Sequence, residues 1–382
     1  MSNKAVKELL KDVLFDVADA IETGNFGSKL RIGITLFGSE HGSKELLRGA
    51  ELAQQNNPGI EVVGIGPSME TDLEIIEVEN EEDQYTKMEE LLDSKDLAAC
   101  VTMHYSFPIG VSTVGKVIAP ANGKELYIAT TTGTSATDRV EAMVRNAISG
   151  ISTAKACGVK DPKVGILNVE GARAVERALN KLKDSGYKFS FTESMRADGG
   201  AVMRGNDLLA ATPDVMVMDS LTGNVMMKMF SSYTTGGSYE ASGYGYGPGI
   251  GEDYDRIIMI LSRASGAPVA AKAIEYAAQV ASGKVNQIAK EEFSSAYKAG
   301  LDSVVETKKE VVSEDVKMPP KKNVTEEIPG IEILDLDDAA KAVWKAGIYA
   351  ETGMGCTGPV ILVAPEDHET AYETLKKAGF VS

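Results

Sequence analysis

The segment Arg31-Ile-Gly-Ile-Thr-Leu-Phe37, followed directly by Gly38-Ser-Glu-His-Gly42, shows the building plan of this chain of 382 residues. The first part is a short apolar run, which is typical of a strand buried in a parallel sheet. The second part is a glycine-containing turn that opens a helix, predicted over 43–55. Such a turn, before a helix N-terminus, is where α/β proteins bind anions. Its glycine spacing does not match the dinucleotide-binding pattern, which disfavours a dehydrogenase.

The same alternation of strand and helix continues toward the C-terminus and predicts an α/β fold. We expect a doubly wound, mostly parallel sheet with helices on both faces. The segment 239–251, rich in glycine and tyrosine, is predicted to be a flexible lid or a surface loop. The further predicted strands are 60–65, 97–101, 126–129, 163–168 and 214–219, and the further predicted helices are 81–94, a segment ending near 157, 172–184, 251–264 and 267–282.

The sequence divides into a large body, a linker and a small C-terminal unit. Residues 1–305 are expected to form the body, which begins with an amphipathic helix over 3–22. The segment 306–330 is charged and contains prolines, as linkers do. Residues 331–382 are expected to form a small α/β appendage that begins with a strand at 331–334. A unit of this size is small to fold alone, so we expect it to dock on the body.

The composition restricts the class of function. Lys and Arg number 39 and Asp and Glu number 56, which gives a net charge of −17. This excess argues against non-specific binding to nucleic acid or to anionic membranes. No apolar run reaches the roughly 18 residues that a membrane span needs, and the three cysteines, far apart in the sequence, imply no disulfide framework. We therefore expect a cytoplasmic protein with no cofactor, no metal and no nucleic-acid or membrane partner.

Cys356 lies in a glycine-rich segment, Glu351-Thr-Gly-Met-Gly-Cys-Thr-Gly-Pro359, just before an apolar run. Glycines allow the backbone to turn tightly and to approach a ligand, and the amides of such a loop can converge on negative charge. A thiol placed there ionises more readily, and the thiolate is the reactive form. The segment therefore makes Cys356 a candidate nucleophile, the alternative being a small residue in a crowded turn. Cys100 is predicted to be a core residue and Cys157 a structural one.

Polar residues follow several of the predicted strands. Thr130-Thr-Thr-Gly-Thr-Ser135 is either a phosphate cradle or a helix cap, and Asn168 ends the next strand. Ser220-Leu-Thr-Gly-Asn224 follows another strand. His104, after the strand 97–101, is either a general base or a structural or substrate-orienting residue. Because open parallel sheets bind ligands at the carboxyl ends of their strands, these segments are well placed for a site.

Two of these segments resemble the acyl-acyl carrier protein:phosphate acyltransferase family of phospholipid synthesis, whose sheet is isocitrate dehydrogenase-like. They are Asp161-Pro-Lys-Val-Gly-Ile-Leu-Asn168 and Asp214-Val-Met-Val-Met-Asp-Ser-Leu-Thr-Gly-Asn-Val-Met-Met-Lys228. The chain departs from that family after Asn168 and at Thr35-Leu-Phe-Gly38. The whole chain is more similar to relatives of that family, the small (alpha) subunits of component C of glycine/sarcosine/betaine reductase complexes. This similarity includes Val101-Thr-Met-His-Tyr-Ser-Phe-Pro-Ile-Gly110, Ala129-Thr-Thr-Thr-Gly-Thr-Ser135 and Gly353-Met-Gly-Cys-Thr-Gly-Pro359.

The resemblance implies a reaction and its partners. A carboxymethylated selenoprotein, component A, supplies a two-carbon unit, which becomes an acetyl thioester on Cys356. Inorganic phosphate then attacks the thioester and gives acetyl phosphate. The resemblance also implies a larger beta subunit of component C, and we expect an oligomer. The catalytic candidates are then Cys356 and His104, and the candidates for binding phosphate or the oxyanion are Thr131, Thr132, Gly133, Asn168 and Asn224.

Two alternatives remain open from the sequence. The first is a stand-alone phosphate acyltransferase that forms acyl phosphates from longer acyl chains and needs a groove for them. The second is a non-enzymatic scaffold subunit that positions a catalytic partner. In the second case Cys356 would be unreactive, with an ordinary thiol pKa.

Overall fold

The computed structural model describes residues 29–197, 199–305, 316–331, 335–355 and 358–381, together with 14, 17 and 18. Cys356 lies outside the described residues. So do most of the predicted helix 3–22, most of the predicted strand 331–334 and the first part of the predicted linker.

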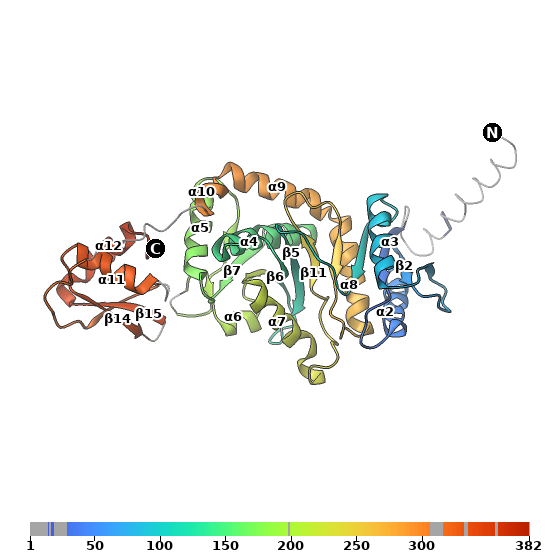
Figure 1. The fold of residues 1–382 in the computed structure, drawn as a ribbon, viewed down its shortest axis with the longest axis horizontal. Helices are drawn as coiled ribbons and strands as arrows, with labels where there is room; N and C mark the ends of the chain where they lie inside the picture. Colours follow the sequence, from blue (N-terminus) through green and yellow to red (C-terminus); the bar gives the residue numbers. More distant parts are fainter. Residues whose placement is uncertain are drawn as a thin grey trace.

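Twelve strands of the body form one sheet (Figure 1). Their order across the sheet is β3-β2-β1-β4-β12-β11-β5-β6-β10-β7-β8, and β9 pairs with β7. The strands are β1 (Leu30–Thr35), β2 (Ile60–Gly66), β3 (Glu74–Glu77), β4 (Ala99–Thr102), β5 (Val111–Ile118), β6 (Glu125–Thr134), β7 (Lys163–Leu167), β8 (Ser190–Phe191), β9 (Val202–Met203), β10 (Val215–Val217), β11 (Gly247–Ile250) and β12 (Ile258–Ile260).

The pairing within this sheet is mostly parallel, as the sequence predicts. Among the described strands of this sheet, only the pairs β12–β11, β11–β5 and β5–β6 are antiparallel. Three successive reversals leave the two parallel sets running in opposite senses. One set contains β1 to β4 and β12, and the other contains β6 to β10. The carboxyl ends of the two sets therefore do not share an edge of the sheet.

Helices cover both faces of the sheet, which confirms the doubly wound α/β class. Neighbouring strand residues point to opposite faces, so Val62 joins a core cluster with α2, α4 and α8, whereas Val63 joins a second cluster with α3 and α7. The helices of the body are α2 (Ser43–Asn56), α3 (Glu81–Asp93), α4 (Arg139–Ala156), α5 (Ala172–Asp184), α6 (Gly205–Leu209), α7 (Ser220–Ser232), α8 (Ala267–Ser282), α9 (Val285–Lys298) and α10 (Leu301–Val305), with a 3₁₀ turn η1 (Tyr233–Thr235) after α7. None of the helices in the described parts of the chain is long and apolar enough to cross a membrane.

Two predictions for the segment 239–264 are wrong. The segment 251–264 is not a helix, because it contains β12 in the middle of the sheet. The segment 239–251 is not a surface loop throughout, because its last residues form the buried strand β11. A Cβ added to Gly247 would lie 1.7 Å from the Val114 carbonyl oxygen. Gly247 therefore allows β11 to pack closely against β5, and it does not indicate a mobile segment.

The C-terminal unit has its own sheet and core. Its three antiparallel strands are ordered β13 (Glu326–Pro329), β15 (Gly358–Val363) and β14 (Ala350–Gly355). The helices α11 (Leu336–Lys345) and α12 (His368–Lys377) pack on it around a separate apolar cluster, with a 3₁₀ turn η3 (Pro365–Asp367) before α12. Strand β13 falls within the segment 306–330, so the sheet of this unit takes in residues that precede 331.

Candidate functional site

The carboxyl end of β6 carries the threonines that the sequence analysis selected. The structure extends this strand through Thr134, where a loop was expected. The Thr131 hydroxyl is fully buried, donates to the Tyr246 carbonyl at 2.6 Å and lies 2.6 Å from the Thr113 hydroxyl. The hydrogen-bonding capacity of this hydroxyl is therefore used inside the protein. Thr132 and Gly133 are half-buried and lie nearer the surface.

The first turns of α7 press against the end of β6. A Cβ added to Gly223 would lie 1.7 Å from the Thr130 carbonyl oxygen, so only glycine fits at this contact. One residue further on, the Asn224 Nδ2 donates to the Thr131 carbonyl oxygen at 3.1 Å. The rest of Asn224 is exposed. Of the predicted site residues, Thr131 and Asn224 are thus in direct contact, and Thr132 and Gly133 follow in the same strand.

Asp219, between β10 and α7, is the N-cap of that helix. Its carboxylate accepts from the Thr222 amide at 3.1 Å and from the Thr222 hydroxyl at 2.6 Å. Arg139, the first residue of α4, donates to the same carboxylate at 3.0 Å and to the Glu170 carbonyl at 3.1 Å. Burial alone would raise the pKa of Asp219, but the Thr222 hydrogen bonds and the positive charge of Arg139 lower it below its usual value.

Arg139 therefore links the segments that follow β6, β10 and β7, which are neighbours in the sheet. Asn168 follows β7 at the same edge and is exposed. The polar groups of these three strands thus share an edge, as the sequence predicted. Arg139 itself was not among the predicted residues, although its place at the start of the helix after the threonines was a usable signal.

His104 follows β4 and is exposed. Strand β4 belongs to the other parallel set, and β12, β11 and β5 separate it from β6. The sheet therefore does not bring His104 to the edge that carries Asn168 and Asn224. The antiparallel strands in the middle of the sheet are the physical reason, because they reverse the direction of one set.

Lys228 was also absent from the predicted site residues, and it lies one helical turn after Asn224 on the same side of α7. Its Nζ lies 2.6 Å from the Glu240 carboxylate and donates to the Ser262 hydroxyl at 3.1 Å. Glu240 is fully buried and also accepts from the Ser265 hydroxyl at 2.8 Å. Since Ser262 follows β12, Lys228 connects α7 to the other half of the sheet. The i, i+4 spacing from Asn224 was the signal for it.

Comparisons with known proteins identify the family of this chain. A family model described as "Fatty acid synthesis protein" matches residues 30–362. The component C subunit alpha of the glycine/sarcosine/betaine reductase complex of Peptoclostridium acidaminophilum is 59% identical over 382 residues, which cover 99% of each chain. The chain belongs to this component C alpha family.

More distant relatives of this chain are phosphate acyltransferases. The enzyme of Thermotoga petrophila is 26% identical over 52% of this chain and 67% of its own length. Among solved structures, a branched-chain phosphotransacylase from Enterococcus faecalis covers 66% of this chain and 99% of its own, with 14% identity and a TM-score of 0.48.

In this member of the component C alpha family, a buried network of hydrogen bonds supports the edge of the sheet at the carboxyl ends of β6 and β10. The hydroxyls of Ser112 and Ser135 both donate to the Asn146 Oδ1. The Asn146 Nδ2 in turn donates to the Met218 carbonyl at 3.1 Å. These contacts tie α4 to β5, to the residue after β6 and to the end of β10. The exposed polar groups beside them are therefore carried on a rigid support.

Two of the cysteines in this family member have environments that suppress reactivity. Cys100 is fully buried, and burial raises the pKa of its thiol well above the usual value. Burial also raises the pKa of Cys157, although a hydrogen bond with Tyr127 and the charge of Lys116 oppose the change. Both thiols are therefore protonated at neutral pH. Cys356 lies outside the described residues.

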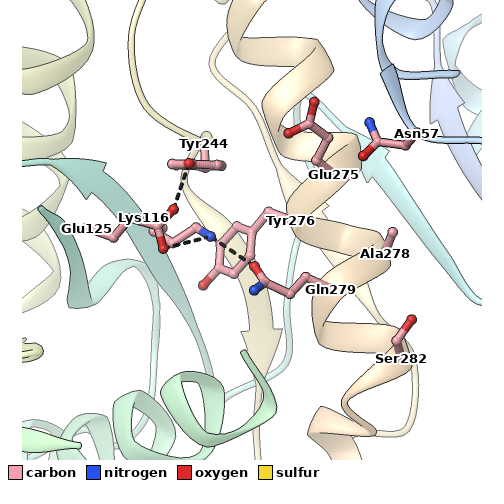
Figure 2. A pocket seen from close by; sticks show the side chains of 9 residues that line it. All are labelled: Asn57, Lys116, Glu125, Tyr244, Glu275, Tyr276, Ala278, Gln279 and Ser282. Atoms are coloured by element: carbon pink, nitrogen blue, oxygen red, sulfur yellow. Dashed lines mark hydrogen bonds and ion pairs between the residues drawn. The ribbon is translucent and has the colours of Figure 1, made fainter. Parts of the chain in front are cut away.

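A pocket of about 400 Å³ lies at the other end of β6 (Figure 2). Lys116, only 2% exposed, donates to the Gln279 side chain at 3.0 Å, pairs with Glu125 at 3.4 Å and lies 4.0 Å from the centroid of the Tyr244 ring. The Tyr244 hydroxyl donates to Glu125 at 2.7 Å. Because these central polar groups bond to one another, they have little hydrogen-bonding capacity left for a ligand.

Proposed function

We propose that this chain acts as the alpha subunit of component C in a glycine reductase-type complex and converts an acetyl thioester to acetyl phosphate. The observation that supports it best is the junction of α7 with the end of β6. There Asn224 is fixed on the Thr131 carbonyl, beside a row of exposed polar groups. The identity of 59% over the full chain to a component C alpha subunit agrees with it.

The proposed step is a phosphorolysis. An oxygen of inorganic phosphate attacks the thioester carbonyl carbon, a tetrahedral oxyanion forms, and the C–S bond breaks. Acetyl phosphate leaves, and the sulfur departs as the Cys356 thiolate. The step needs donors for phosphate and for the oxyanion. We assign this role to the Asn224 amide, the Thr132 hydroxyl, the Gly133 backbone amide and the Asn168 amide.

Thr131 has a supporting part in this proposal, since its hydroxyl is already bonded inside the protein. Its carbonyl orients Asn224. Arg139 is a further candidate, because its charge lies at the same edge and Asp219 holds it in place at 3.0 Å. A catalytic role of His104 stays a prediction, since its strand runs opposite to β6.

Cys356 is the proposed acetyl carrier. The raised pKa values of Cys100 and Cys157 support this choice, because a carrier must react as a thiolate. Cys356 directly follows β14 in the sequence, so the unit 331–382 must dock on the body 1–305 for the thioester to meet phosphate. The part of the segment 306–330 that precedes β13 is proposed as the linker that permits this.

The proposal includes partners. A carboxymethylated selenoprotein, component A, supplies the two-carbon unit, and a larger beta subunit completes component C. We place the assembly in the cytoplasm. No cofactor or metal is assigned, and within the described parts of the chain no cluster of three His, Cys, Asp or Glu residues is arranged to hold a metal ion.

An acyl-trapping experiment tests the proposal. The purified chain is incubated with acetyl phosphate, and the intact mass and the labelled peptide are read. Reverse phosphorolysis should add an acetyl group, about 42 Da, to the peptide that contains Cys356, and added phosphate should remove it. Cys356→Ser should take up no thioester label, whereas the matched control Cys157→Ser should be labelled like the wild type. Absence of label, or label on Cys100 or Cys157, would exclude the carrier role and favour the scaffold.

A further inference from the structure

The segment 103–110, which joins β4 to β5, crosses the sheet from one edge to the other. Strand β4 ends at Thr102, and β5 begins at Val111. The two strands run in the same direction, because β12 is parallel to β4 and two antiparallel pairs, β12–β11 and β11–β5, follow. The segment therefore returns from the carboxyl end of β4 to the amino end of β5, which lies beside the carboxyl end of β6. We call it the crossing segment.

The crossing segment lies on the face of the sheet that α7 covers. Phe107 packs in the same apolar cluster as Met227 of α7. A Cβ added to Gly249 of β11 would lie 2.4 Å from the Phe107 ring, and the centroids of the Phe107 and Tyr254 rings are 5.7 Å apart. On the neighbouring strand β5, a Cβ added to Gly115 would lie 2.8 Å from the Met227 sulfur. Phe107 therefore anchors the crossing segment beside α7.

Backbone hydrogen bonds fix the end of the crossing segment against the end of β6. The Gly110 amide donates to the Thr134 carbonyl at 2.8 Å, and the Val111 amide closes a turn by donating to the Pro108 carbonyl at 3.2 Å. Gly110 has a φ of +102°, a conformation that favours glycine. Ile109 lies in this turn with its side chain 74% exposed. Within the part of the chain that the structure describes, no other isoleucine is as exposed.

Ile109 lies next to the groups to which the proposed function assigns phosphate and the oxyanion. Gly133 pairs with Ser112, which follows Ile109 by three residues. Asn224 approaches the same strand end from α7, at the Thr131 carbonyl oxygen. Water competes with phosphate for the exposed polar groups at this edge, because both form hydrogen bonds with them. An apolar side chain held rigidly at this place excludes water from the atoms that it covers, and packing of an acetyl group on it removes its own apolar surface from water.

We infer that Ile109 covers the acetyl group of the thioester and makes phosphate, and not water, the attacking group. The inference rests on the proposed function, because it concerns the fate of the proposed thioester. In phosphorolysis, a phosphate oxygen bonds to the carbonyl carbon, the C–S bond breaks and the sulfur leaves as a thiolate. In the competing hydrolysis, a water oxygen forms that bond, the C–S bond breaks, one water proton passes to the sulfur and the other to solvent, and acetate leaves. Ile109 is thus a residue that determines specificity for the attacking group.

The decay of the acetylated protein tests the inference. The purified full chain is loaded with acetyl phosphate labelled in its acetyl group, the excess is removed, and release of the label is followed without and with inorganic phosphate. Without phosphate, Ile109→Ser should release acetate at least about 10-fold faster than the wild type, because water reaches the carbonyl carbon. With phosphate, the release of acetyl phosphate should change by less than about threefold, because Ile109 donates no hydrogen bond to phosphate or to the oxyanion.

Two control variants separate this effect from a general change in the protein. Ile109→Leu keeps an apolar side chain of the same size and should release acetate at the wild-type rate. Ile118→Ser is the matched control, because Ile118 ends the same strand β5 and is 42% exposed. The eight residues of β5 place it about 25 Å from the turn that carries Ile109. This variant should also release acetate at the wild-type rate.

The contrary results distinguish the inference from the proposed function. If Ile109→Ser released acetate at the wild-type rate, or if Ile118→Ser accelerated the release equally, the inference would be wrong and the carrier role of Cys356 would stand. A wild type that takes up no label would remove both. Urea unfolding checks that each variant is folded. Ile109→Thr, which keeps a β-branched side chain, repeats the test should Ile109→Ser unfold.

Discussion

The two ends of β6 are both rich in polar groups, yet they differ in how those groups are used. At the amino end, the charge of Lys116 is shared among Glu125, Gln279 and the ring of Tyr244. At the carboxyl end, one hydroxyl is buried and bonded, whereas Asn224 and its neighbours keep exposed polar atoms. The pocket therefore lies at the amino end of β6, where the polar groups already bond to one another. What distinguishes a candidate site is capacity for hydrogen bonding that the fold leaves unused.

The largest effect is expected at the carboxyl end. Asn224→Ala should lower kcat/KM for phosphate about 100-fold, or about 2.7 kcal/mol, because a hydrogen bond to a charged group is lost. Phosphate-dependent release of acetyl phosphate measures it. Asn122→Ala is the matched control, since Asn122 donates in the same way to a backbone carbonyl, that of Ala210, at 2.7 Å just before β6. If Asn224→Ala and Asn122→Ala lowered kcat/KM for phosphate equally, the two ends of β6 would not differ in function.

A smaller effect is expected at the amino end, and on stability alone. Lys116→Met should destabilise the protein by about 2 kcal/mol, because contacts of a desolvated cation with two tyrosine rings are lost. Urea unfolding measures it, and kcat/KM for phosphate should stay within about twofold. Lys272→Met, at a lysine 48% exposed and 6.0 Å from the same Tyr244 ring, should change stability far less. A loss of activity in Lys116→Met without a loss of stability would contradict the reading of this pocket as structural.

The smallest effect concerns pH. The pKa of Asp219 is lowered in the folded protein, so its ionised form stabilises the fold above the unfolded pKa of about 3.9. This contribution is lost as the pH falls through the folded pKa. The difference in unfolding free energy between wild type and Asp219→Asn should be constant from about pH 7 to 5 and shrink below about pH 4. Denaturant unfolding at each pH measures it, and a difference that grows in acid would refute it.

The sequence predicted the parallel parts of the fold well, because each buried strand is a short apolar run before a polar turn. It missed the middle of the sheet. The sequence predicts a helix that includes Ile257–Leu261, because periodicity alone cannot separate a short buried strand from a buried helix. The glycines around Gly247 predict a flexible lid or a surface loop, although the Val114 carbonyl excludes any side chain at Gly247. Because of these errors, the sequence does not predict the antiparallel strands in the middle of the sheet, which place His104 and Asn224 at opposite edges.

The candidate site was predicted in part. Thr132, Gly133, Asn168 and Asn224 lie at the carboxyl ends of neighbouring strands because parallel strands share an edge. That Thr131 turns inward could not be foreseen, since it depends on the Thr113 hydroxyl of the neighbouring strand β5 and on the carbonyl of Tyr246, which lies just before β11. Pairing between segments far apart in the sequence leaves no local signal.

Strand β15 separates the point where the chain enters the C-terminal unit from the residues next to Cys356 in the sequence. The chain enters this sheet at Glu326, which pairs with Val363 at the end of β15. Gly355 and Gly358, which flank Cys356 in the sequence, pair with each other at the opposite end of the same strand. Six strand residues span about 20 Å. A rotation of this unit about its point of attachment therefore displaces Gly355 and Gly358 more than it displaces the residues beside Glu326.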